Sequence, residues 1–307
     1  MPKHIDVIGA PIDAGGGRSG AAEGPGALIA GGILSRLEAA GHTVCHRDIF
    51  EASRDAPLSV KPVKTRRTAN VNEVAEAIAL LAAQTFASLR TGHTPLVLGG
   101  DHSVVVGSIG AALHPDLLSG KELGLIWIDA HYDAHTGKTT SSGNANGMPL
   151  ASILGRGLRA FRTPIGGRKI HPSNVIHIGA GKKDCEPEEI TLLDRMKVRR
   201  FTEADILATG MIPVGEAYAE LCGRVDAIWV SFDLDAVNHY WAPGVAYPNQ
   251  GGLSYQSLMQ LATFLASKGK IIGADIVEHT PRLEKWDALG RPLTATLATE
   301  FAIRLFE

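Results

Sequence analysis

Three residues with side chains that can bind metal ions stand at alternate positions near the middle of the chain. Asp129, His131 and Asp133 close an apolar stretch, 123–128, that is typical of a buried strand. Alternate residues of an extended chain point to the same face, so two carboxylates and an imidazole could reach one point in space. A set richer in carboxylate than in imidazole favours a hard or borderline divalent ion, Mn²⁺ more than structural Zn²⁺. A polar turn with solvated side chains would show the same pattern, so this motif alone does not establish a metal site.

Similar polar residues end other apolar stretches. Asp233 and Asp235 repeat the alternate carboxylates at the end of one stretch, and His102 and Glu278 follow two more. Apolar stretches alternate with helical patterns, which predicts an α/β fold with a mostly parallel central sheet and helices on both faces. Ligands of such sheets bind at the carboxyl ends of the strands. The residues that we expect to meet there are His102, Asp129, His131, Asp133, Asp233, Asp235 and Glu278.

The charge of these residues indicates how many ions they hold. Four aspartates in one crevice would repel one another, and burying an unpaired ionised group costs several kcal/mol. Two divalent cations balance four carboxylates, whereas one ion leaves a charge of −2. We therefore expect two ions roughly 3.5 Å apart, bridged by a hydroxide. Their charge would lower the pKa of water enough to supply this nucleophile near neutral pH.

Composition narrows the class of protein. The 307 residues carry 30 basic and 32 acidic side chains, and no basic patch or acidic tail indicates a nucleic-acid partner. The three cysteines, Cys45, Cys185 and Cys222, are widely spaced, which favours a reducing, cytoplasmic setting over a disulfide framework. No apolar run is long enough to span a membrane, and no signal peptide precedes the first strand pattern.

The rest of the chain shows no linker and no internal repeat, so we expect a single domain over residues 1–307. A glycine-rich loop at 11–25 lacks the spacing and the lysine of a phosphate-binding loop. Residues 28–40 have the pattern of one helix, and 51–70 that of a surface loop. The polar segment 134–147 is long for a connection in a compact domain, and such loops usually carry function. Its hydroxyl and amide groups would suit a polar or zwitterionic ligand.

Three of these motifs together resemble a known enzyme family. Residues 99–103, 129–133 and 231–235 are similar to the signatures of the arginase/agmatinase (ureohydrolase) family, and the resemblance covers nearly the whole chain. It implies a three-layer α/β fold, two Mn²⁺ ions per chain, and hydrolysis of a guanidino group to urea and an amine. It also implies trimers or hexamers of identical chains. Carried over by motif, the metal ligands are His102, Asp129, His131, Asp133, Asp233 and Asp235.

The resemblance extends to catalytic and substrate-binding residues and is closer to arginase than to agmatinase. Glu278 matches the glutamate that pairs with the substrate guanidinium through two parallel hydrogen bonds. Asp133 would form a hydrogen bond with the hydroxide. Residues 142–144 match the loop that holds the amino-acid end of the substrate, with Ser142 at the α-carboxylate and Asn144 beside it. Glu186 takes the place of an aspartate that reads the α-amino group.

Several departures from the family pattern lie in the substrate pocket and spare the metal ligands. Asn146 stands where arginases carry a histidine regarded as a proton shuttle, and an amide cannot transfer a proton in this way. His135 replaces an asparagine that touches the carboxylate, and Tyr247 replaces a small threonine near the guanidinium. Residues 236–239 also differ from the usual continuation of the third motif. Water or His135 would then protonate the leaving amine.

Three hypotheses follow. The first is hydrolysis of L-arginine to urea and ornithine, at a rate limited by the missing histidine. The second is hydrolysis of another guanidino compound, such as agmatine, a guanidino acid or a hydroxyarginine, which the bulk of Tyr247 favours. The third is a metal-binding protein with little catalysis, which the loss of the histidine favours and the intact ligand motifs oppose.

Overall fold

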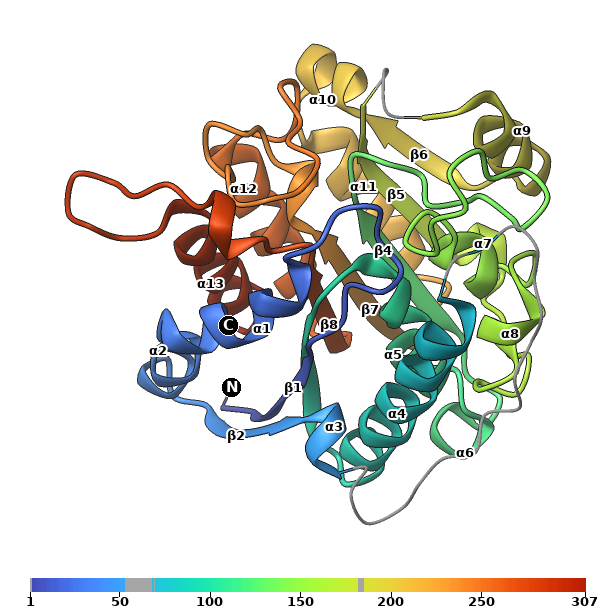
Figure 1. Cartoon of the computed structure of the whole chain (residues 1–307), viewed down its shortest axis with the longest axis horizontal. Helices are drawn as coiled ribbons and strands as arrows, with labels where there is room; N and C mark the ends of the chain where they lie inside the picture. The colour runs from blue at the N-terminus through green and yellow to red at the C-terminus, as the bar shows by residue number, and fades with distance from the viewer. Residues whose placement is uncertain (1, 53–67, 69, 182–184) are drawn as a thin grey trace.

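An eight-stranded parallel sheet forms the centre of the molecule (Figure 1). The structure is a computed structural model that describes residues 2–52, 68, 70–181 and 185–307. The strand order is β2-β1-β3-β8-β7-β4-β5-β6, and every neighbouring pair runs parallel. The predicted α/β fold is therefore confirmed. The strands are β1 (His4–Ala10), β2 (Thr43–Asp48), β3 (Thr94–Gly99), β4 (Leu123–Ile128), β5 (Val175–Ala180), β6 (Arg199–Thr202), β7 (Ala227–Asp233) and β8 (Ile271–Val277).

Both faces of the central strands are buried, which explains why these strands are continuous apolar runs in the sequence. In β4, Leu125 and Trp127 point into one hydrophobic core, whereas Ile126 and Ile128 point into the other. This alternation follows from the two-residue period of an extended chain.

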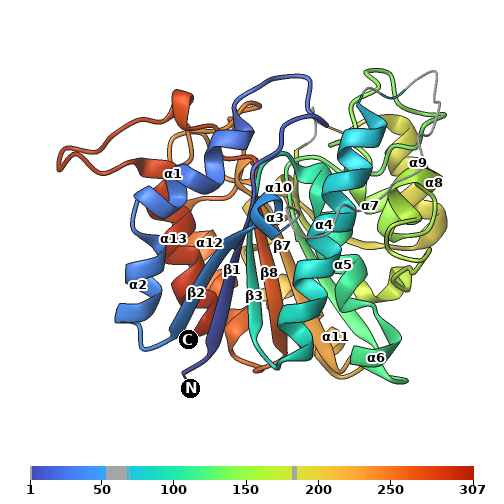
Figure 2. The same ribbon diagram turned by 60° about the horizontal axis from the view of Figure 1, so that its bottom comes forward.

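Helices cover the two faces and make a three-layer molecule (Figure 2). One layer contains α1 (Gly24–Ala30), α2 (Ile33–Ala39), α10 (Glu203–Thr209), α11 (Ile212–Cys222), α12 (Tyr255–Ala266) and α13 (Leu293–Phe306). The other contains α3 (Ile49–Ala52), α4 (Val71–Arg90), α5 (Val105–Ala112), α6 (Pro115–Leu118), α7 (Pro149–Ile153), α8 (Arg159–Arg162) and α9 (Pro187–Met196). Short 3₁₀ turns are η1 (Ala21–Glu23), η3 (His102–Val104), η4 (Pro172–Asn174), η5 (Leu234–Ala236) and η6 (Pro281–Leu283).

The structure differs from the sequence-based prediction at residues 28–40 and at β6, among other places. The single helix expected over 28–40 is wrong, because α1 ends at Ala30 and α2 begins at Ile33. Gly32 between them has a φ of 91°, a left-handed conformation that interrupts an α-helix and that glycine adopts at little cost. β6 was not predicted, since a four-residue edge strand beginning with two arginines has no apolar run to reveal it.

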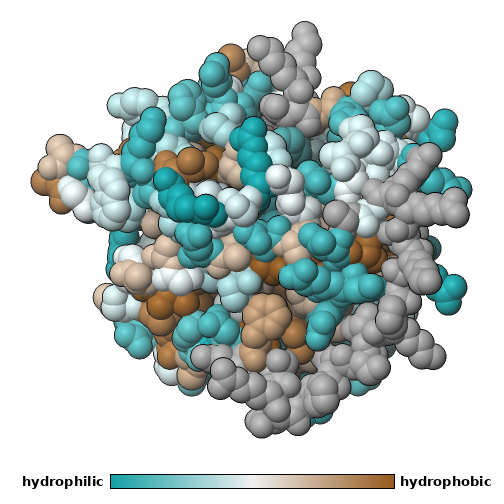
Figure 3. Space-filling view, viewed as in Figure 1, coloured by the Kyte–Doolittle hydropathy of each residue, from teal (hydrophilic) through white to brown (hydrophobic). Residues whose placement is uncertain are grey.

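The surface is mostly polar on the face drawn in Figure 3, where apolar side chains lie in small separate patches. The segment between η6 and α13 projects from the body and carries exposed Trp286 and Leu289 (Figure 1). Most of the surface loop predicted over 51–70 lies outside the described residues. Cys45, Cys185 and Cys222 form no disulfide bond within the described residues. None of the helices in the described ranges combines the length and apolar character of a membrane span.

Candidate metal centre

The candidate metal ligands lie at the carboxyl ends of β3, β7 and β4, and Glu278 follows β8. These four strands are neighbours at the centre of the sheet, in the order β3-β8-β7-β4. His102 begins η3 just after β3, and Asp129 directly follows β4. Asp233 ends β7, and Asp235 lies in η5. Parallel pairing puts these strand ends along one edge, and so side chains more than 100 residues apart in sequence come together.

Three carboxylates surround one nitrogen of His102. Its Nδ1 lies 3.1 Å from Asp129 Oδ2, 3.0 Å from Asp133 Oδ2 and 3.0 Å from Asp233 Oδ2. All four side chains are nearly or completely buried. His102, Asp129 and Asp133 form a group whose ligand atoms lie close enough to hold one metal ion.

A second group is built around His131. Its Nδ1 lies 3.2 Å from Asp235 Oδ2 and 3.6 Å from Asp129 Oδ1. Asp129, His131 and Asp235 could hold another ion, and Asp129 is common to both groups. One carboxylate with an oxygen directed to each group is the arrangement expected of a ligand that bridges two ions.

The geometry fits cations better than it fits hydrogen bonds. His102 Nδ1 is buried and makes no hydrogen bond, although three carboxylate oxygens lie near it. Neighbouring ligand atoms of an octahedral ion with bonds of about 2.1 Å lie about 3.0 Å apart, which matches these separations. Within the described residues, histidines and no lysine or arginine form the ion pairs of these aspartates. Divalent ions would supply the missing positive charge.

Burial and mutual repulsion alter the pKa values of these carboxyl groups. Burial, together with the charge of Asp129, raises the pKa of Asp133 to about 7. Burial and the charge of Asp235 raise the pKa of Asp233 well above its usual value. Asp129 is the exception: burial acts to raise its pKa, but the proximity of His102 and His131 outweighs burial and lowers it. Protons and metal ions therefore compete for this cluster.

Buried donors orient the ligand carboxylates. Trp127 Nε1 donates to Asp129 Oδ2 over 2.9 Å, and the Trp127 ring stacks on His102 with centroids 4.4 Å apart. The backbone N–H of His131 donates to Asp129 Oδ1 over 2.7 Å. Trp127 was not among the residues predicted for the site, although its position two residues before Asp129 places both side chains on one face.

Glu278 lies beside the cluster, at the end of β8. Its Oε1 accepts the backbone N–H of His102 over 2.9 Å and the side-chain amide of Asn146 over 3.3 Å. Burial, together with the charge of Asp101, raises the pKa of Glu278 to about 8. Glu278 and Asp133 have φ values of 65° and 49°, which are uncommon for residues other than glycine. Such backbone strain is often found at functional sites.

The other predicted substrate contacts lie on the segment after Asp133 and at the start of α9. His135 is nearly buried, with Nε2 3.5 Å from Glu186 Oε2 and 3.6 Å from Glu189 Oε2. Glu186 is about half exposed. Ser142 is exposed, and its hydroxyl accepts the backbone N–H of Asn144. These four predicted residues form none of the ion pairs of the aspartate cluster.

Tyr247 reaches the cluster from the loop after η5. Its ring meets the His131 ring edge to face, with centroids 6.2 Å apart. The guanidinium of Arg18 lies over the Tyr247 ring, 4.5 Å from its centroid. It also donates a hydrogen bond to the carbonyl of Ala246. The glycine-rich loop thus contributes Arg18, a residue that the sequence analysis did not single out.

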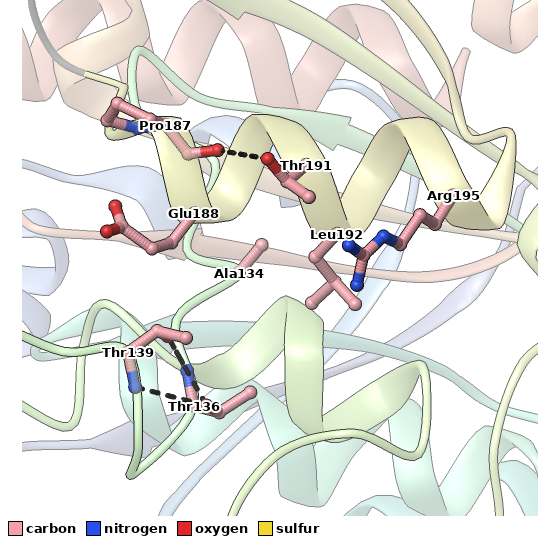
Figure 4. Close-up of a pocket in the computed structure, with 8 residues that line it drawn as sticks. All are labelled: Ala134, Thr136, Thr139, Pro187, Glu188, Thr191, Leu192 and Arg195. Atoms are coloured by element: carbon pink, nitrogen blue, oxygen red, sulfur yellow. Dashed lines mark hydrogen bonds between the residues drawn. The ribbon is translucent and has the colours of Figure 1, made fainter.

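A pocket of about 370 Å³ opens beside the centre, between the segment after Asp133 and helix α9 (Figure 4). Thr136 and Thr139 line one side, and Glu188 and Arg195 of α9 line the other. None of the candidate metal ligands lines it. The metal centre is therefore distinct from this pocket.

Comparisons with known proteins agree with this geometry. The family model described as the arginase family matches residues 3–306. An arginase of Brevibacillus brevis is 36% identical over 310 residues, which cover 99% of this chain and 100% of the relative. The solved structure of arginase from Bacillus caldovelox has a TM-score of 0.86 and 34% identity, over 99% of this chain and 98% of that one.

Another solved structure is Entamoeba histolytica arginase in complex with L-ornithine, with a TM-score of 0.86 and 25% identity. The match covers 100% of this chain and 99% of that one. The family match and the relatives, each covering the chain nearly end to end, confirm the prediction of an enzyme of the arginase type. The chain therefore belongs to the arginase family of amidinohydrolases.

Proposed function

We propose that the protein hydrolyses the guanidino group of L-arginine to urea and ornithine, with two Mn²⁺ ions per chain. The ligands would be His102, Asp133 and Asp233 for one ion, His131 and Asp235 for the other, and Asp129 for both. The observation that carries the proposal is the buried His102 Nδ1, which has three carboxylate oxygens within 3.1 Å and no hydrogen bond. An oxygen-rich site with two imidazoles suits Mn²⁺.

Two ions bound here would lower the pKa of water and so supply a nucleophile near neutral pH. The side chains of the protein then orient the reaction. Glu278 Oε1 is already bonded by His102 and Asn146, which fixes the carboxylate so that it can receive a guanidinium. A cation beside it would favour the ionised form of Glu278, in opposition to its burial. Asp133 would accept a hydrogen bond from the attacking water.

The leaving amine must gain a proton, and the histidine that the family resemblance predicts for this step is replaced by Asn146. Asn146 orients Glu278 and has no titratable proton. His135 is the imidazole on the adjoining segment, and its Nε2 faces Glu186 and Glu189. We propose that His135 or water donates this proton, and that turnover is slow as a result.

A second candidate is a different guanidino substrate, such as agmatine, a guanidino acid or a hydroxyarginine. The observation that favours it is the Tyr247 ring, which lies against His131 where the family resemblance predicts a small threonine. The L-ornithine complex of the Entamoeba histolytica relative supports the first candidate instead.

The proposal includes the setting that the family resemblance implies. We propose a cytoplasmic enzyme that assembles as a homotrimer or homohexamer and that acts on a small guanidino substrate without nucleic acid or membrane. Three cysteines without a disulfide bond among the described residues, and the exposed Trp286 and Leu289 of the projecting segment, are compatible with this setting.

Urea release from a panel of guanidines tests the proposal. The manganese-loaded protein should release urea from L-arginine with a higher kcat/KM than from agmatine, a guanidino acid or hydroxyarginine. Asp129→Asn, which alters the shared ligand, should abolish this activity. A higher kcat/KM for another guanidine would establish the second candidate. Two manganese ions per chain with no urea from any guanidine would contradict both and indicate a metal-binding protein with little catalysis.

A further inference from the structure

Arg18 lies on a loop that is anchored beside the candidate metal centre. The loop leaves β1 at the same edge of the sheet as the candidate ligands (Figure 2). The backbone N–H of Gly15 donates to Asp101 Oδ2 over 2.8 Å, and the carbonyl of Gly15 accepts the backbone N–H of Asn146 over 3.1 Å. These bonds tie the loop both to the turn after β3 and to the long polar segment 134–147.

The same loop packs closely against Asn144 and Tyr247. A Cβ added to Gly17 would lie 2.6 Å from Asn144 Nδ2 and 3.2 Å from Tyr247 Oη, so a larger residue would displace these side chains. The Tyr247 ring in turn meets the ring of His131, with centroids 6.2 Å apart. The loop, the polar segment and Tyr247 therefore come together next to a candidate metal ligand.

The guanidinium of Arg18 is held in place with donors to spare. It lies 4.5 Å from the centroid of the Tyr247 ring and donates to the carbonyl of Ala246, and it forms no ion pair among the described residues. A guanidinium has five N–H donors in a planar fork, which can hold a carboxylate through two parallel hydrogen bonds. The aromatic ring and the carbonyl thus orient a cation whose remaining donors are available to an anion.

The position of this cation bears on the far end of the substrate. The candidate ligands are mostly buried, Tyr247 is half-buried and Arg18 is exposed, so the arginine lies on the solvent side of the centre. A substrate with its guanidinium at the ions directs its other end toward solvent. L-Arginine, hydroxyarginine and guanidino acids carry a carboxylate at that end, whereas agmatine carries an ammonium group. A positive charge here attracts the first three and repels agmatine.

We infer that Arg18 is a specificity-determining residue that binds the carboxylate of the substrate, so that the site takes guanidino compounds with a carboxylate in preference to agmatine. The inference rests on the proposed function, which places the guanidinium of the substrate at the metal centre. The loop bonds of Gly15 and the contact with Tyr247 hold Arg18 at this position before a substrate binds.

Arg18→Gln tests the inference, because it removes the charge and keeps an amide donor. The ratio of kcat/KM for L-arginine to kcat/KM for agmatine should fall by about 10–100-fold, as expected for the loss of a hydrogen bond to a charged group. Arg18→Lys keeps the charge without the fork, and its ratio should fall less. Manganese stoichiometry should equal that of the wild type, since the exposed Arg18 is not a candidate ligand.

Arg282→Gln is the matched control. Arg282 is a second exposed arginine beside the same loop, with Nη2 3.5 Å from Ser19 Oγ and Nε paired with Glu23 over 3.2 Å. Both variants remove one positive charge near the loop, and only Arg18 lies over Tyr247. Because an exposed ion pair contributes little, Arg282→Gln should change the ratio by less than about twofold.

Three results would overturn the inference. Equal losses of kcat/KM for L-arginine and agmatine in Arg18→Gln would show that Arg18 only supports Tyr247. An unchanged ratio would show that Arg18 does not contact the carboxylate. The same fall of the ratio in Arg282→Gln would show that the total charge of this surface, and no particular residue, sets the preference.

Binding of products keeps the two proposals apart. Calorimetric titration of the manganese-loaded protein with L-ornithine, and with putrescine as the analogue without a carboxylate, requires no turnover. Arg18→Gln should weaken L-ornithine more than putrescine. That result in a protein that releases no urea would support the inference and contradict the proposed function. A wild type that hydrolyses L-arginine, and whose affinity for L-ornithine does not depend on Arg18, would contradict the inference and leave the proposed function in place.

Discussion

The side-chain amide of Asn146 donates to Glu278 Oε1 over 3.3 Å, and the backbone N–H of His102 donates to the same oxygen over 2.9 Å. A residue that replaces the expected proton-transfer group is therefore used to hold the carboxylate that would bind the guanidinium. The site keeps its means of orientation and lacks a titratable group at this position.

Asn146→His should raise kcat for urea release by about 10–100-fold, because a positioned acid or base typically contributes at least this much. The measurement is kcat against pH for L-arginine, in which the variant should gain a dependence on a group that titrates near neutral pH. Asn146→Gln, which keeps an amide, is the control and should not gain it. An unchanged or lower kcat in Asn146→His would show that proton transfer does not limit turnover.

Glu278→Gln should lower kcat/KM by about 10²–10³-fold, which corresponds to the loss of one partner from a buried ion pair. The glutamine oxygen can still accept from His102 and Asn146, but its NH₂ group would face the N–H groups of the substrate. Manganese stoichiometry should stay the same, since Glu278 is not among the candidate ligands. Activity close to that of the wild type would exclude Glu278 as the guanidinium-binding residue.

Without metal ions, the folded protein should lose stability as the pH rises from about 6.5 to about 8.5. Burial raises the pKa of Asp133 to about 7 and that of Glu278 to about 8, whereas the usual values are 3.8 and 4.5. The folded state therefore binds more protons than the unfolded state in this window, and the free energy of unfolding falls as these protons are lost.

Thermal unfolding in the presence of a chelator checks this sign. The Tm should be lower at pH 8.5 than at pH 6.5, and added Mn²⁺ should raise it most at pH 8.5, where ions no longer compete with protons. A chelated protein whose Tm rises with pH would contradict the description of the cluster.

Gly107→Ala should destabilise the fold by about 1–3 kcal/mol, because added atoms force well-packed groups apart. A Cβ at this position of α5 would lie 2.4 Å from the carbonyl oxygen of Ile78 in α4. Gly26→Ala is the control in α1, since a Cβ there meets nothing within 4 Å. Urea unfolding should show a gain of about 0.4–1 kcal/mol for Gly26→Ala. Equal effects of the two changes would show that α4 and α5 do not pack this closely.

The candidate ligands could be predicted from sequence because each ends an apolar strand. Asp129 and Asp233 are marked by the strands that precede them, and parallel topology requires that such ends share an edge of the sheet. No knowledge of strand order was needed for this step. The structure adds that β3, β8, β7 and β4 are neighbours. This order places His102 Nδ1 3.1 Å from an Asp129 oxygen and 3.0 Å from an Asp233 oxygen.

The partners of the ligands were less predictable. Ser231 Oγ lies 3.1 Å from His102 Nε2 only because the strand order brings β7 close to β3, which the sequence of either strand does not specify. Arg18 reaches Tyr247 across more than 200 residues through the conformation of a glycine-rich loop. The break at Gly32 depends on a single left-handed residue within an otherwise helical pattern.

Anomalous diffraction at the manganese absorption edge, from crystals of the manganese-loaded protein, tests the central claim most directly. We predict two peaks roughly 3.5 Å apart. One should be bonded by His102 Nδ1 and the other by His131 Nδ1, with Asp129 bonded to both. A single peak, no peak between these side chains, or two ions that do not share Asp129 would contradict the account.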